Sequence, residues 1–158
     1  MMSRAFLLTT EPRGVIPMLK RFLRVTDVPF SASAGLLALR VVIGVAFMFH
    51  GWGKIQAPFS WMGPTAPVPG FLQGLAALSE FGGGLAWILG LLTPVASLGL
   101  AATMAVAVAV HVSNGDPFVA MGGPSYEAAA VYLGISVALL LVGPGRLSVD
   151  AAVFGTKR

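Results

Sequence analysis

The sequence contains no cysteine, and that absence excludes several kinds of chemistry. The chain cannot form a disulfide, a thiolate nucleophile, or a cysteine-ligated zinc or iron–sulfur centre. Soluble-enzyme motifs are missing too: no Gly-x-Ser-x-Gly occurs, and the glycines at 82–84 lie inside an apolar run and do not follow a strand. Any redox chemistry would therefore depend on a bound cofactor or on a partner protein.

Charge is also scarce, because only 10% of the 158 residues are charged and 56% are hydrophobic. Soluble domains carry about 25% charged residues, so most of this single-domain chain must face lipid. The net charge of +4 is spread over ten basic residues that form no stripe, which argues against nucleic acid as a partner. The lipid bilayer is the predicted surrounding.

Four apolar spans predict an all-α integral membrane protein, a bundle of four transmembrane helices at roughly 32–50, 71–92, 94–112 and 126–142. Each span approaches the ~20 residues that cross a hydrocarbon core. Thr93 and Pro94 are suited to the N-cap and N1 positions of a helix, so the second and third spans should be separate helices joined by a tight turn. Rows of small residues at four-residue spacing, such as Gly82-Ala86-Gly90 and Ala130-Gly134-Ala138, predict close helix packing.

The distribution of basic residues predicts that both termini are cytoplasmic. The loops 51–70 and 113–125 contain a single basic residue, Lys54. The side of the termini carries eight basic residues: Arg4, Arg13, Lys20, Arg21, Arg24, Arg146, Lys157 and Arg158. Cytoplasmic loops carry the excess of Lys and Arg, so these two loops should be exterior.

The chain is divided into a basic cytoplasmic leader at 1–30, a membrane domain at 31–150 and a cytoplasmic tail at 151–158. The leader has too short an apolar run for a signal peptide. Residues 18–25 alternate apolar and basic faces, which fits a short helix lying in the headgroup region; a disordered basic tail fits them equally.

The first span carries Arg40 near its middle, and a charge at that depth normally has a partner. Glu80 is the one acidic residue inside the second span, so we expect a buried Arg40–Glu80 ion pair. The pair either fixes the register of the two helices or handles a proton or ligand.

A second polar cluster is predicted near the exterior boundary, formed by His50, Lys54, His111 and Glu127, with Asp116 in the adjoining loop. Each residue also has an ordinary explanation, since lysines snorkel and acidic residues favour the first turn of a helix. Together they predict a polar pocket whose donors would suit the carbonyls of a quinone. A metal is not expected, because no His-x-x-x-His or Glu-x-x-His spacing occurs.

Three motifs resemble the DoxX family of small four-helix bacterial membrane proteins. They are His50-Gly-x-x-Lys54, Glu80-Phe-Gly-Gly-Gly84 and Gly143-Pro-Gly-Arg146, within a match that runs over about 33–150. The resemblance implies a bacterial inner-membrane protein that is a subunit of a membrane redox system, with quinone as the implied cofactor and redox proteins as partners. The catalytic residues are not defined by it.

Two other functions and one assembly state stay open at this point. The chain is alternatively a non-enzymatic membrane anchor or assembly factor for a redox partner, in which the buried charges are structural. A small-solute transporter is a third reading, but four short spans leave little room for a path unless the chain forms a homo-oligomer.

Overall fold

The computed structural model describes residues 22–157, which form five helices and two short strands. In chain order these are β1 (Val25–Thr26), α2 (Phe30–Gln56), α3 (Gly70–Leu89), α4 (Thr93–Ser113), α5 (Glu127–Val142), α6 (Val149–Phe154) and β2 (Thr156–Lys157). Most of the predicted leader lies outside the described residues.

The four long helices lie where the apolar spans were predicted, with ends shifted by up to six residues. The predicted N-cap of α4 is wrong by one residue: Leu92 and not Thr93 holds that position, and its side chain makes no capping hydrogen bond. By length and composition α2 and α4 can each cross a membrane, and α5 is a shorter apolar helix of 16 residues. The apolar sequence of α3 is interrupted by Gln73, Ser79 and Glu80.

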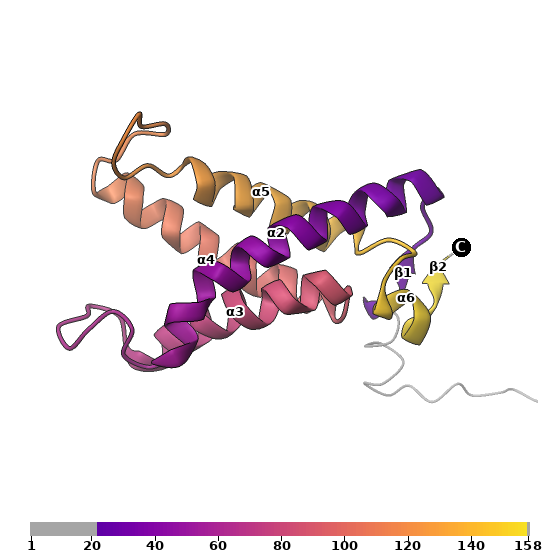
Figure 1. The fold of residues 1–158 in the computed structure, drawn as a ribbon, viewed down its shortest axis with the longest axis horizontal. Helices are drawn as coiled ribbons and strands as arrows, with labels where there is room; N and C mark the ends of the chain where they lie inside the picture. Colours follow the sequence, from indigo (N-terminus) through magenta and orange to yellow (C-terminus); the bar gives the residue numbers. More distant parts are fainter. Residues whose placement is uncertain (1–21, 158) are drawn as a thin grey trace, which may run out of the picture.

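The helices form two antiparallel hairpins, α2–α3 and α4–α5, which pack on each other through α3 and α4. Figure 1 shows the hairpins diverging toward the end that carries the loops 57–69 and 114–126, here called the loop end. The opposite end, called the terminal end, carries α6, β1 and β2. The strands β1 and β2 pair in parallel, with Val25 opposite Thr156.

Glycines set the close approach of α2 to α3. A Cβ added at Gly84 would lie 2.6 Å from the carbonyl oxygen of Gly44, and one at Gly51 would lie 2.5 Å from the backbone nitrogen of Phe81. Small residues allow such backbone contact in lipid, where packing replaces the hydrophobic effect as the force between helices. These two contacts fix the antiparallel register of the hairpin.

The small-residue rows expected from four-residue spacing are only partly used. A Cβ at Gly134 would meet nothing within 4 Å, so that row on α5 makes no close helix contact at its centre. Gly82 faces only the side chain of Leu78 on its own helix, whereas its neighbour Gly83 lies against Leu100 of α4. Spacing alone did not show which face of each helix packs.

The terminal end is tied together by Asp150 of α6. Its carboxylate accepts the backbone N–H groups of Leu92 and Thr93 at 2.7 and 2.8 Å, at the start of α4. Its own N–H donates to the carbonyl of Gly90 at 2.8 Å, just after α3. A carboxylate at a helix N-terminus satisfies free N–H groups and complements the helix dipole. The tail therefore caps the α3–α4 turn.

The distribution of apolar side chains is that of a protein surrounded by lipid. The buried core is small, consisting of Phe47, Trp87, Leu100, Met104 and Leu139. Large apolar side chains are instead exposed on every long helix, for example Phe49 at 79%, Leu78 at 60%, Val106 at 61% and Leu141 at 76%. Soluble proteins rarely expose continuous apolar surface of this extent.

Candidate functional site

The strongest polar contact near the loop end is the ion pair between Lys54 in the last turn of α2 and Glu80 in the middle of α3. The Lys54 ammonium nitrogen lies 2.6 and 2.7 Å from the two carboxylate oxygens of Glu80, and Glu80 is 2% exposed. The contact of Gly51 with the Phe81 backbone brings the two helices together one turn away. The indole ring of Trp61 covers the ammonium, with its centroid 4.7 Å away.

The predicted Arg40–Glu80 pair does not form. Arg40 is fully buried and donates hydrogen bonds to the carbonyl oxygens of Trp87, at 3.0 Å, and Leu147. The reason is the antiparallel register set by the glycines, which places the first half of α2 beside the last turn of α3 and the end of α2 beside Glu80. The prediction paired the two residues because they lie at similar depths in the membrane. Depth does not determine which residues of two packed helices lie side by side.

The loop 57–69 is held over the ion pair by Gln73, which is 3% exposed. Its side chain accepts the N–H of Met62 at 3.1 Å and donates to the carbonyl of Val68 at 2.9 Å. Its backbone carbonyl accepts the indole N–H of Trp61 at 3.0 Å. The loop is thus fixed where Trp61 can shield Lys54.

On the second hairpin, His111 in the last turn of α4 pairs with Asp116 in the following loop. The distance from His111 Nδ1 to Asp116 Oδ2 is 2.7 Å. The chain turns back here, since the N–H of Asp116 also donates to the His111 carbonyl at 3.0 Å. An ionised carboxylate only accepts hydrogen bonds, so this contact places the ring proton on Nδ1.

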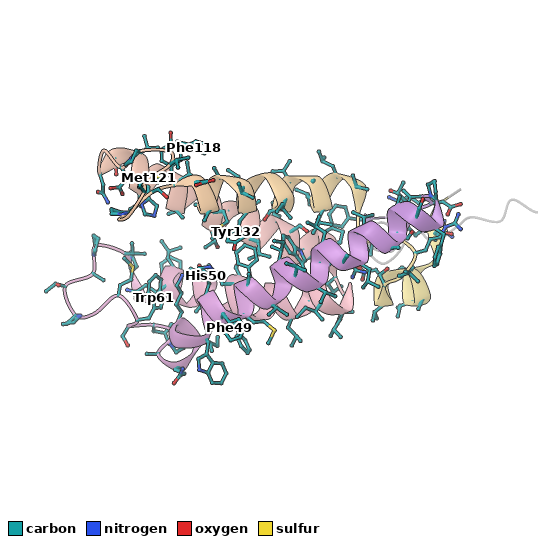
Figure 2. The ribbon with its side chains drawn as sticks, turned by 45° about the horizontal axis from the view of Figure 1, so that its top comes forward. Phe49, His50, Trp61, Phe118, Met121 and Tyr132 are labelled. Carbon is teal, nitrogen blue, oxygen red and sulfur yellow. The ribbon has the colours of Figure 1, made fainter. Side chains whose placement is uncertain are left out.

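A cavity of about 240 Å³ lies between the two hairpins and is here called the inter-hairpin cavity. Phe47 and His50 of α2 face Tyr132 of α5, with ring centroids 5.0 and 6.0 Å apart. Figure 2 shows His50 and Tyr132 in the space between these helices, with Trp61 on one side and Phe118 and Met121 on the loop of the other hairpin. The lining consists of Phe47, His50, Lys54, Glu80, Met104, Ala107, His111, Ser125, Ala128, Ala129 and Tyr132.

The structure brings three of the four residues of the predicted polar cluster into this cavity: His50, Lys54 and His111. Glu127 does not line it; its side chain is exposed in the first turn of α5, where it complements the helix dipole. Glu80 takes the carboxylate position that was expected of Glu127. Tyr132 was not singled out from the sequence, although it is the one polar aromatic residue within its helix.

The cavity is amphipathic. Its polar groups gather at the loop end, whereas Phe47, Met104 and the body of Tyr132 form apolar walls. Within residues 22–157, no group of three or more histidine, aspartate or glutamate residues is arranged to hold a metal ion. The arrangement suits an amphipathic organic ligand whose polar group reaches the histidines and the ion pair.

An apolar exterior, a small core and charges paired inside a helical bundle define an integral membrane protein. The DoxX family model matches residues 35–112. The inner membrane protein YqjF of Escherichia coli strain K12 is 32% identical over 123 residues, which cover 73% of this chain and 89% of that protein. The chain belongs to the DoxX family and is a multi-pass protein of the bacterial inner membrane. No solved structure matches it.

Proposed function

We propose that this protein is the quinone-binding subunit of a membrane redox system, with the quinone ring in the inter-hairpin cavity. The observation that carries this proposal is the convergence of His50, His111 and the Lys54–Glu80 pair on one cavity with aromatic walls. A quinone is amphipathic in the same way as the cavity, because its ring carries polar carbonyl groups and its tail is apolar. The tail would extend between α2 and α5 toward the lipid.

The size of the cavity supports a ring and not a whole lipid. Its volume of about 240 Å³ lies below the ~300–1,000 Å³ of pockets that enclose drug-sized ligands. A single substituted ring fits within it, and an isoprenoid chain would have to leave through the side. His50 and Ala128 line the cavity and are exposed residues, which supports an open side.

All four long helices cross the membrane in this proposal, with both termini in the cytoplasm. The exposed apolar residues on α3 and α5 as well as on α2 and α4 support this arrangement. The terminal end carries Arg24, Arg146 and Lys157, whereas in the described chain the loop end has only Lys54, which is paired with Glu80. The cavity would then open near the exterior face of the bilayer.

Electrons would have to reach the quinone from another protein. The chain has no cysteine to hold an iron–sulfur cluster or to form a redox disulfide. A redox partner protein is therefore part of the proposal, and the membrane subunit contributes the quinone site and its proton-exchanging groups.

The test is to purify the protein gently from its native membrane and to identify bound lipids and quinones by native mass spectrometry. We expect bound quinone in the wild type and in Asp27→Asn, a matched control at the terminal end, where Asp27 pairs with the exposed Arg146. His50→Phe and Lys54→Met should lose it. A quinone-free protein that co-purifies with a soluble enzyme would contradict the proposal and favour a membrane anchor.

A further inference from the structure

The hydrogen-bonding groups of the inter-hairpin cavity are not equally free to meet a ligand. Lys54 has three N–H donors, but its ammonium contacts both Glu80 oxygens and lies under the Trp61 ring. The most obvious donor for a quinone carbonyl is therefore already engaged. The Glu80 carboxylate, in contrast, keeps lone pairs beyond the one that each oxygen directs at Lys54.

His111 offers a further acceptor. Asp116 holds the proton on Nδ1 through the 2.7 Å contact, and Asp116 itself does not line the cavity. The remaining polar atom of the ring is Nε2, which in the neutral tautomer has a lone pair and no proton. A carboxylate that orients a histidine in this way also makes Nε2 a better acceptor. Because His111 lines the inter-hairpin cavity, Nε2 is the atom of this pair that can accept a hydrogen bond from a ligand there.

We infer that the inter-hairpin cavity recognises the reduced, hydroxyl-bearing form of its ring ligand, through a hydrogen bond donated by a quinol hydroxyl to His111 Nε2, with Asp116 as the positioning residue. This inference rests on the proposed function and goes beyond it, because the donors expected from the sequence would select the oxidised carbonyl form. His50, Ser125 and Tyr132 can each donate or accept, so they fit either form and do not decide the preference.

The inference is tested by anaerobic equilibrium dialysis of the full chain in phosphatidylcholine nanodiscs, whose headgroups carry no hydrogen-bond donor. The probes are the tail-less ring 2,3-dimethoxy-5-methylbenzoquinone, its quinol and the dimethyl ether of that quinol, with empty nanodiscs as the blank. Addition of the quinone to thiols cannot interfere, because the chain has no cysteine. We expect the quinol to bind about threefold to tenfold more tightly than the quinone, the value of one net hydrogen bond.

Variants assign the preference to the pair. His111→Phe removes the acceptor and should bring the quinol-to-quinone affinity ratio to about one. Asp116→Asn can donate to Nδ1 and shift the ring proton to Nε2, so this ratio should fall to one or below. Asp116→Glu should restore the wild-type ratio, and Asp27→Asn should leave it unchanged. A purely structural role of Asp116 would weaken both ligands equally.

The outcomes separate the inference from the function on which it rests. Binding of neither ring form would overturn the proposed function. If the wild-type protein bound the quinone as tightly as the quinol, the inference alone would be overturned. The same holds if it bound the dimethyl ether as tightly as the quinol. A quinol preference that persists in a folded His111→Phe protein would also overturn it.

Discussion

The Lys54 ammonium and the Glu80 carboxylate meet at 2.6 and 2.7 Å across the α2–α3 hairpin, with Glu80 buried and Lys54 partly open to the inter-hairpin cavity. The contact joins the end of one helix to the middle of the next. The contact has two roles: it fixes the α2–α3 hairpin, and it supplies charged groups to the inter-hairpin cavity.

Removing one partner of this pair should cost more than removing both. Lys54→Met leaves a buried carboxylate without its cation, and we expect a loss of about 3 kcal/mol in the free energy of unfolding. The double variant Lys54→Met with Glu80→Met should recover at least about 1 kcal/mol of that loss, since it leaves no uncompensated charge. Unfolding by SDS from dodecylmaltoside micelles measures each value. Additive effects of the two substitutions would show that the contact is not energetically coupled.

Arg40 and Glu80 should behave independently, because they share no partner. Arg40 holds the carbonyl oxygens of Trp87 and Leu147, while Glu80 holds Lys54. The effects of Arg40→Met and Glu80→Gln on unfolding free energy should add within about 0.5 kcal/mol in the double variant. The same SDS titration provides the comparison with the Lys54–Glu80 cycle. A coupling energy as large as in that cycle would show that Arg40 and Glu80 interact, as the sequence predicted.

The different partners of Arg40 and Lys54 show which features of the fold could be predicted from the sequence and which could not. Apolar runs and the Thr93-Pro94 pair placed the helices to within six residues, because length and hydropathy are local properties. The partner of Glu80 depended on which glycines touch across α2 and α3. Gly44, Gly51 and Gly84 make those contacts. Two of them lie in the motifs of the sequence, but the motifs do not show which of the 20 glycines touch another helix.

The site was predictable to the same degree. His50, Lys54 and His111 were grouped because each ends a span at the same boundary, and the cavity contains all three. Glu127 shares that boundary but faces outward, and Tyr132 faces inward from one and a half turns further along α5. The rotation of a helix about its axis decides such cases. Apart from Glu127, Tyr132 and Ser136, α5 is apolar on every side, so the sequence gives only a weak signal for that rotation.

Asp150 should stabilise the terminal end more than its place in a six-residue helix suggests. Its carboxylate accepts two backbone N–H groups, one of them from Leu92, which has a positive φ of 48°. Asp150→Ala leaves both groups without their acceptor, and we expect a loss of about 2 kcal/mol in unfolding free energy. Asp27→Ala removes an exposed ion pair with Arg146 and should cost less than about 1 kcal/mol.

Thermal unfolding in nanodiscs compares these two variants directly. Limited proteolysis of the tail provides a second measurement, since Asp150→Ala should expose residues 149–157 to cleavage before the bundle unfolds. Equal stability of the Asp150 and Asp27 variants would contradict the capping role of Asp150.

A last prediction concerns the glycine contact that sets the register of α2 on α3. In Gly84→Ala the new methyl group would lie 2.6 Å from the Gly44 carbonyl oxygen, which belongs to the backbone and cannot rotate away. The helices must separate, at a cost of about 1–3 kcal/mol. The Lys54–Glu80 contact should loosen as a consequence, because it depends on the same approach. Binding of the quinone ring should therefore weaken in parallel with stability.

Gly134→Ala on α5 is the matched control, since its methyl group meets nothing within 4 Å. It should be neutral or stabilise the helix by up to about 1 kcal/mol, the difference in propensity between alanine and glycine. SDS unfolding and ring dialysis of the two variants side by side test both consequences. If Gly84→Ala matched Gly134→Ala in stability and in binding, the glycine contact would not determine the register. The position of Glu80 beside Lys54 would then need another cause.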